Sequence, residues 1–371
     1  MQHKSQDRAV LHKLIDRNSI NRYNLSDNSL ILSFLGEQRS IIREKIALET
    51  ISGLTNWRLT VSREDEGVTI LRALTCDKKA ILPDELFGLP VTGLKDRALA
   101  AGAAPAEGEE LRVLGGMETG EWDNRNITEL TLPRFLHHIG DYAFMNLRSM
   151  QTLRFFDDLC SFGSAGFMNC FSFSRLELLR TGPQQGVALA SLVYSMQQEL
   201  DVTVFETDGS ILRLIFPEYI EEYTENNAAH HFELKIIGGG YAYHSVFRNK
   251  SLSISDYDAL WPDYITQEHD EDSALRLAYC RLCFPVQLSK QALARYTDYL
   301  RINMKRALSL ALRERDIGGL RMLLALDGFD KEALDAALME SRTLQITEAT
   351  AILLEKRHTI LAAGRSRSFE L

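Results

Sequence analysis

The chain repeats one pattern of apolar and polar positions at an interval of 23 residues. Residues 139–146 read IGDYAFMN, and residues 162–169 read FGSAGFMN. The same shift aligns Leu130-Thr131-Leu132 with Leu153-Arg154-Phe155, and an alternation of period two is typical of a short strand with one buried face. A unit of this length cannot close a core alone. We therefore expect consecutive units to stack and to bury their apolar edges against one another.

Nearly every position that the units share is apolar, glycine or asparagine. The aligned sets are Ile127/Met150/Phe173, Leu130/Leu153/Leu176, Leu132/Phe155/Leu178, Leu136/Leu159, Ile139/Phe162, Gly140/Gly163, Phe144/Phe167, Asn146/Asn169 and Leu147/Cys170. The two phenylalanines are expected in the interior, where burial of each contributes ~1.5–3 kcal/mol. The glycines are expected to permit a tight bend, and the asparagines to bond backbone groups at a turn.

One stretch of the repeat, LTLPRFLHHIGDYAFMN (130–146), resembles the leucine-rich repeat of the BspA-like bacterial type. In that family a strand, a proline, an apolar-x-x-Ile-Gly and an Ala-Phe recur about every 23 residues. ILPDELFGLPVTGLKDRALA (81–100) is similar to the opening repeat of the family, with Lys95 in place of the glycine and Leu99 in place of the phenylalanine. The resemblance covers residues 57–180 and implies a short solenoid that binds other proteins.

The segments that flank the repeats are expected to cap them, because two or three copies are the minimum for a stable stack. Strands over 57–61 and 68–71 bracket the turn residues 64–67, which predicts a hairpin. Residues 100–126 are small and acidic, and we interpret them as a mobile insertion. Segment 27–53 is ambiguous between strands and a helix, with strands favoured for Leu30–Phe34.

The 23-residue register disappears after Gly182-Pro183. A hairpin is predicted over 202–217 around Asp208-Gly209, and a further strand over 232–236 before three glycines. These glycines indicate a turn or a bulge, because their spacing fits neither GxGxxG nor GxxxxGK[ST].

The C-terminal part has the period of helices. Helices are expected over 270–285 and from Leu288 onward. Segments 307–326 and 333–357 form an imperfect pair whose Leu-Leu steps lie 30 residues apart, which resembles degenerate ankyrin-type helix pairs without that family's Thr-Pro-Leu-His signature.

These patterns predict an α+β fold: a short leucine-rich repeat β-solenoid with N-terminal β structure and a C-terminal all-helical repeat domain. The expected divisions are an N-terminal helix and β cap, the solenoid with its insertion, a small β segment, a helical ankyrin-like domain and a tail. Their ranges are 1–56, 57–182 with 100–126 inserted, 183–250, 251–360 and 361–371.

Charge and cysteine usage narrow the class of protein. A formal charge of −9 and a pI near 5.6 argue against general nucleic-acid binding. The best apolar window, Val187–Met196, is far short of the ~20 residues needed to span a bilayer. Five scattered cysteines fit a reducing compartment, and the charged start of the chain lacks the apolar stretch of a secretory signal. We therefore expect a cytoplasmic protein, unless a leader was removed.

Few residues suggest chemistry, and we expect no catalytic, cofactor-binding or metal-binding residue. Cys280 and Cys283 form a CxxC inside an apolar helical segment and are interpreted as core thiols. The pairs His137-His138 and His230-His231 diverge in extended chain, which is a poor arrangement for one ion. Aromatic residues between 241 and 261 are expected to pack between the sheet and the helices, although they are also the place for a groove.

The outward positions of the repeat strands are the best candidates for a partner. In the repeat register they form two rows, Glu129/Thr152/Arg175 and Thr131/Arg154/Glu177. Opposite charges side by side stabilise neighbouring strands by ~0.2–1 kcal/mol each, and the same rows form the sheet face on which solenoids often bind a partner.

The sequence therefore predicts non-catalytic binding of another protein, of unknown identity. Two alternatives stay open: an enzyme with a pocket at the β/helical junction near residues 238–261, and an exported surface adhesin, as many BspA-like relatives are.

Overall fold

The structure is a computed structural model, and it describes residues 55–115, 120–182, 187–226, 231–326 and 331–367. The strands are β1 (Trp57–Glu64), β2 (Gly67–Leu74), β3 (Lys79–Ile81), β4 (Glu85–Leu86), β5 (Leu89–Leu94), β6 (Glu109–Val113), β7 (Glu129–Thr131), β8 (His138–Ile139), β9 (Thr152–Phe156), β10 (Ser161–Phe162), β11 (Arg175–Leu179), β12 (Leu200–Phe205), β13 (Ile211–Phe216), β14 (Ile220–Asn226), β15 (His231–Ile237), β16 (Phe247–Arg248) and β17 (Ser251–Leu252). The helices are η1 (Asn124–Asn126), α3 (Ala188–Tyr194), α4 (Tyr241–His244), α5 (Ile254–Ala259), α6 (Trp261–Tyr264), α7 (Glu271–Cys283), α8 (Lys290–Ile302), α9 (Met304–Arg313), α10 (Ile317–Ala325), α11 (Lys331–Thr343) and α12 (Thr347–Arg367).

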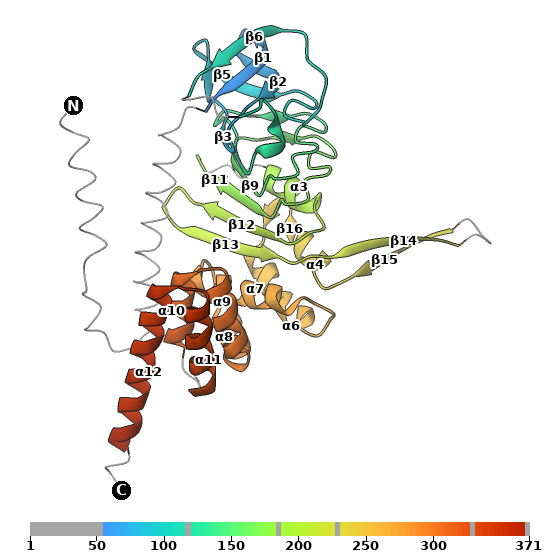
Figure 1. Ribbon diagram of the computed structural model, residues 1–371. Helices are drawn as coiled ribbons and strands as arrows, with labels where there is room; N and C mark the ends of the chain where they lie inside the picture. Colours follow the sequence, from blue (N-terminus) through green and yellow to red (C-terminus); the bar gives the residue numbers. More distant parts are fainter. Residues whose placement is uncertain (1–54, 116–119, 183–186, 227–230, 327–330, 368–371) are drawn as a thin grey trace, which may run out of the picture.

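The N-terminal part is a β-solenoid, and the C-terminal part is a set of helices packed against its last coils (Figure 1). The repeats of β7–β8 and β9–β10 each give one strand to each of two sheets, and the next repeat gives β11 to the first sheet and helix α3 in place of the second strand. The first sheet has the order β13-β12-β11-β9-β7-β3, and the second has the order β10-β8-β5-β2-β1-β6. Pairing between consecutive repeats is parallel in both sheets, because every coil runs in the same direction.

The core register of the solenoid is the one that the repeat predicts. Leu130 pairs with Leu153, and Leu153 pairs with Leu176; all three side chains are buried. The predicted hairpins β1–β2 and β12–β13 are also present. However, β12 pairs in parallel with β11, so the first sheet continues past residue 182, where a separate β segment was expected to begin.

Aromatic side chains form a ladder through the solenoid core. The ring centroids of Phe144 and Phe167 are 5.3 Å apart, and those of Phe167 and Phe173 are 4.5 Å apart. Phe162 stacks on the same column. The prediction that Phe144 and Phe167 share the interior is therefore confirmed.

The repeated glycines have a different role from the tight bend that we expected. Gly140 and Gly163 do not have positive φ angles. A Cβ at Gly163 would instead lie against backbone atoms of Gly140, and one at Gly140 would lie against the backbone of Asp96 in the preceding coil. Glycine recurs here because neighbouring coils approach too closely for a side chain.

Substitution of Gly163 by Ala is expected to lower the free energy of unfolding by about 1–3 kcal/mol, because the added methyl group must push two coils apart. Chemical denaturation measures this change. Gly182→Ala is the matched control, since a Cβ there meets no atom within 4 Å. Equal stability of the two variants would contradict the close approach.

The asparagines that end the repeated octet do lie at turns, with φ near 66° for Asn146 and 61° for Asn169. The amide of Asn169 donates to the side-chain oxygen of Asn146 at 2.8 Å, and Asn146 donates to the carbonyl oxygen of Ala101 at 3.4 Å. The asparagines thus connect coils as well as close turns.

The predicted mobile insertion at 100–126 is largely integrated into the fold. Its strand β6 pairs antiparallel with β1. The buried Asn124 donates to the carbonyl oxygens of Ala73 and Leu99 at 2.8 Å each and accepts from the backbone N–H of Thr75 at 3.0 Å. Side-chain capping of buried backbone groups explains this order; a sequence pattern of small and acidic residues did not reveal it.

The C-terminal helices agree with the predicted helical period. Helices α9–α10 and α11–α12 form two hairpins whose connecting turns repeat at 30 residues: Arg315 and Gln345 both have φ near 55°. The backbone N–H groups of Asp316 and Ile346 donate back to the carbonyl oxygens of Ala311 and Ser341. Helix α12 extends to Arg367, into the expected tail, whereas the strands favoured at Leu30–Phe34 lie outside the described residues.

Candidate interaction surface

The outward face of the first sheet carries the predicted rows in the predicted order. Glu129 lies opposite Thr152, which lies opposite Arg175. The second row runs from Thr131 through Arg154 to Glu177 in the same way. Both rows extend further than expected, and the added members are Lys79, Ile81, Asp201, Thr203, Arg213 and Ile215.

The six candidate residues differ in their exposure. The side chain of Arg175 is 51% exposed, that of Glu129 is 36% exposed and that of Glu177 is 16% exposed. Thr131, Thr152 and Arg154 are buried, which corrects the expectation that the whole of both rows is open. The exposed part of the surface is therefore limited to Lys79, Glu129 and Arg175 in the first row.

Ion pairs cross the strands along this face. The ammonium of Lys79 lies 2.7 Å from the carboxylate of Glu129, and the guanidinium of Arg154 lies 2.6 Å from that of Glu177. The predicted neighbour pair Arg154–Glu177 is thus confirmed. The alternation of positive and negative side chains stabilises neighbouring strands. It also gives the surface a charge pattern that a partner can match.

Asp201 joins three elements of the face. Arg213 donates to both of its carboxylate oxygens, at 2.8 and 2.6 Å, and Arg175 approaches to 3.7 Å. Burial raises the pKa of Asp201, but the charges and hydrogen bonds of Arg213 and Arg175 outweigh this effect and hold it below its ordinary value. The carboxylate is therefore ionised at neutral pH and orients Arg175.

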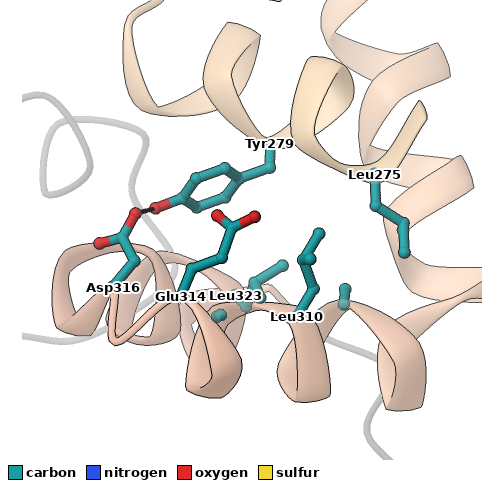
Figure 2. Close-up of a pocket in the computed structure, with 8 residues that line it drawn as sticks. Leu275, Tyr279, Leu310, Glu314, Asp316 and Leu323 are labelled. Atoms are coloured by element: carbon teal, nitrogen blue, oxygen red, sulfur yellow. Dashed lines mark hydrogen bonds between the residues drawn. The ribbon is translucent and has the colours of Figure 1, made fainter. Parts of the chain in front are cut away.

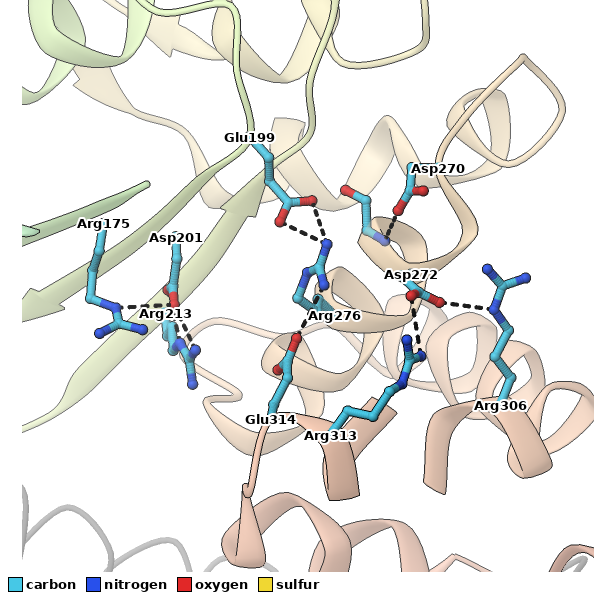
Figure 3. Close-up of polar contacts among 11 residues, drawn as sticks. Arg175, Glu199, Asp201, Arg213, Asp270, Asp272, Arg276, Arg306, Arg313 and Glu314 are labelled. Carbon is cyan, nitrogen blue, oxygen red and sulfur yellow. Dashed lines mark hydrogen bonds and ion pairs between the residues drawn. The ribbon is translucent and has the colours of Figure 1, made fainter. Parts of the chain in front are cut away.

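Helix α7 closes one end of the face by packing against β13 (Figure 3). Its Arg276 lies 2.9 Å from Glu199, just before β12, and 3.1 Å from Glu314, just after α9. Asp272, also on α7, binds Arg306 and Arg313. The sheet and the helices are therefore held together by charged contacts, and at the β3 end of the face the side chains of Lys79 and Glu129 are exposed.

The repeated segment of the chain matches one known family. Residues 117–223 match the family model described as the BspA type leucine-rich repeat region (6 copies). This segment is therefore similar to the BspA type of leucine-rich repeat. The match begins later than the predicted resemblance and extends past residue 182, in agreement with the continuation of the sheet through β12 and β13. No curated protein and no solved structure matches the chain.

The junction between the leucine-rich repeats and the helices is a packed aromatic seam. Tyr243, Tyr257 and Trp261 are buried and meet one another or nearby rings edge to face. The hydroxyl of Tyr257 donates to the carbonyl oxygen of Ile215 at 2.5 Å. These contacts place Tyr243, Tyr257 and Trp261 in the core, as the packing interpretation expected, whereas Tyr241 and Phe247 are only half-buried.

His244 belongs to the same seam. Its ring nitrogens lie 3.0 Å from the carbonyl oxygen of Val193 and 2.9 Å from that of Pro217. Burial lowers the pKa of His244, although these backbone contacts oppose the shift. Both nitrogens thus face backbone carbonyl oxygens, the neutral ring donates to one of them, and its position connects α3, β13 and α4.

A small pocket lies between helices α7, α9 and α10, beyond the leucine-rich repeats (Figure 2). Its volume is about 10 Å³, which is room for about one water molecule, whereas small-molecule sites take roughly 300–1,000 Å³. Tyr279 donates from its rim to Asp316. We interpret the pocket as a packing gap.

The CxxC of α7 consists of two core thiols. Cys280 and Cys283 are free and buried, and burial raises the pKa of Cys280 to about 12, so the thiol is protonated and unreactive at neutral pH. His137 and His138 are exposed; His230 lies outside the described residues. Among the residues that the structure describes, no group of three or more His, Cys, Asp or Glu side chains is arranged to hold a metal ion, and no helix is long and apolar enough to cross a membrane.

Two important residues of the surface, Asp201 and Arg213, were missed by the repeat pattern. Helix α3 occupies the place of a strand between β11 and β12, which lengthens the interval from Leu176 to Val202 to 26 residues. The alternation within 202–214 was visible, but its register with Arg175 was not.

Proposed function

We propose that the chain is a non-catalytic protein-interaction module that binds a partner through the outward face of its leucine-rich repeat sheet. The main observation behind this proposal is that the strands from β3 to β12 pair in one continuous register. This pairing places the exposed charges of Lys79, Glu129 and Arg175 in one row. BspA-type repeats support a role in binding proteins. A partner with a complementary alternation of acidic and basic side chains fits this row.

A charge exchange within the row tests the proposal. The double variant Glu129→Lys/Arg175→Glu keeps the net charge and reverses only the pattern. Proteins captured by the wild-type chain from its native cells are identified, and the affinity of each purified partner is then measured by calorimetry. We expect the exchange to weaken binding roughly tenfold or more, because two rim charges become mismatched.

A second exchange serves as the control. Arg295→Glu/Glu355→Lys alters two exposed side chains of the helical part by the same charges. The proposed surface is contradicted if the sheet variant binds every captured protein with unchanged affinity. It is also contradicted if both double variants lose the same amount of binding affinity.

We also propose that α9–α12 are two degenerate ankyrin-type repeats, supported by their matching turns at a 30-residue interval. A cytoplasmic location is proposed as well, supported by five free cysteines. Fractionation of the native cells tests the location, and recovery only outside the cell contradicts it in favour of a surface adhesin.

A further inference from the structure

Strands β14 and β15 form a two-stranded hairpin that projects away from the body of the protein (Figure 1). Within the described residues, β14 and β15 pair only with each other, so each presents an open edge. Two-stranded hairpins are marginally stable on their own in water. An extended hairpin with open edges is also a template for another strand.

One face of the hairpin carries exposed apolar side chains, with Glu221 opposite Ile236 at its base. Tyr223 lies opposite Leu234, and their exposed fractions are 64% and 47%. Ile236 lies two positions further along β15, on the same face, and is also exposed. This band of apolar side chains has no cover in the described part of the chain.

The charges distinguish the two edges. The sequence of β14, IEEYTEN, holds three glutamates and no positive residue, so two copies of this strand repel each other. In β15, Glu233 and Lys235 flank Leu234. An antiparallel pair of β15 strands centred on Leu234 therefore sets Glu233 of each copy opposite Lys235 of the other.

The pairs inside the hairpin fit the same arrangement. Lys235 lies opposite Glu222 of β14, so in the centred arrangement each Lys235 has one glutamate on either side. On the other face, Tyr223 and Leu234 of one copy continue into Leu234 and Tyr223 of the second. The β15 edge is thus self-complementary in charge and in apolar pattern, as a two-fold contact requires.

We propose that two copies of the chain associate through the β15 edges, antiparallel about a two-fold axis at Leu234, to form a four-stranded sheet. The occupant of the open edge is a second copy, because the complementarity is with the strand itself. This contact is separate from the partner surface proposed on the solenoid, so either proposal can fail alone.

Light scattering across a concentration series of the full chain tests the association, with two single variants. Glu233→Lys places lysine opposite lysine, and Lys235→Glu places glutamate opposite glutamate. Each variant alone is expected to raise the dimer dissociation constant roughly tenfold or more, from two like-charge pairs. A mixture of the two variants restores both pairs and is expected to form a heterodimer with near wild-type affinity.

Cross-linking provides a second measurement that does not depend on charge. In a Cys160→Ser background, which removes the exposed native thiol, Leu234→Cys is expected to form an intermolecular disulfide, because residues opposite each other across antiparallel strands have Cβ atoms about 4.5–5.5 Å apart. Tyr223→Cys, one strand further from the axis, is the control and is expected to remain reduced.

Three results overturn the proposal. They are a wild-type chain that stays monomeric at all concentrations, a mixture of variants that associates no better than its components, and equal cross-linking at positions 234 and 223. If the β15 edge binds only a strand of another protein, the wild-type chain alone stays monomeric at all concentrations.

Discussion

Substitution of Phe144 by Ala is expected to lower the free energy of unfolding by about 3–5 kcal/mol, one of the two largest effects that the structure predicts. The ring of Phe144 is fully buried and stacks against both Phe162 and Phe167, which also stack on each other. Its removal forfeits the transfer free energy of the ring and leaves a cavity that adjacent coils cannot fill, because their spacing is fixed by the ladders on both sides.

Urea denaturation followed by circular dichroism measures this change. Phe171→Ala is the matched control: Phe171 follows the next copy of the octet but is 76% exposed, so its removal is expected to change stability by less than about 0.5 kcal/mol. A loss below about 1 kcal/mol for Phe144→Ala would show that the coils relax around the gap, contrary to a rigid ladder.

The repeating part of the fold could be predicted from the sequence because equivalent positions recur in several repeats, and each copy supports the same assignment. Leu130, Leu153 and Leu176 occupy equivalent positions on three neighbouring strands. A shift of one residue in the strand register would move these side chains from the core to the opposite face of the sheet. The predicted rows of the candidate surface follow from the same register. Their order was therefore correct even where the exposure was not.

What the sequence did not reveal depends on contacts between distant residues. Asn124 has an ordinary neighbourhood in the sequence, yet it satisfies backbone groups of Ala73 and Leu99. The close approach of Gly163 to Gly140 is likewise a property of two coils. Burial of Thr152 and Arg154 also arises only after folding, which is why an outward position in a strand did not guarantee an accessible one.

The packing of the helices against the solenoid also depends on contacts between residues far apart in the sequence. Arg276 connects α7 to Glu199 before β12, α7 packs against β13, and Tyr257 of the aromatic seam connects α5 to β13. A binding surface that extends over the sheet keeps its shape only if this joint is rigid, and the joint in turn depends on the position of α7. The interior of the helical part therefore matters for the proposed function, although it does not touch the proposed surface.

Asp258 and Arg281 form the buried ion pair that positions α7 relative to α5. The guanidinium of Arg281 donates to both carboxylate oxygens of Asp258 at 2.8 and 2.9 Å, and Tyr296 of α8 donates to the same carboxylate at 2.9 Å. Arg281 also donates to the carbonyl oxygens of Phe284 and Val286, each at 3.1 Å. Every strong donor of the cluster is thus paired, as a buried charge requires.

Asp258→Leu is expected to lower the free energy of unfolding by about 3–5 kcal/mol, because it leaves the fully buried guanidinium of Arg281 without a counter-charge. The double variant Asp258→Leu/Arg281→Met is expected to recover much of this loss, since apolar replacement of both partners removes the stranded charge. Tryptophan fluorescence during denaturation follows the change, because Trp261 packs against Tyr296.

The exposed ion pair of α8 provides the comparison that separates burial from charge. Asp298 lies 3.7 Å from Arg301, and both side chains are exposed; Asp298→Ala is expected to change the free energy of unfolding by less than about 1 kcal/mol. If Asp258→Leu cost no more than this, the Arg281 charge would have another route to solvent. If the double variant were as unstable as the single one, the cluster would stabilise the joint through its hydrogen bonds to Tyr296 rather than through compensation of the buried charge.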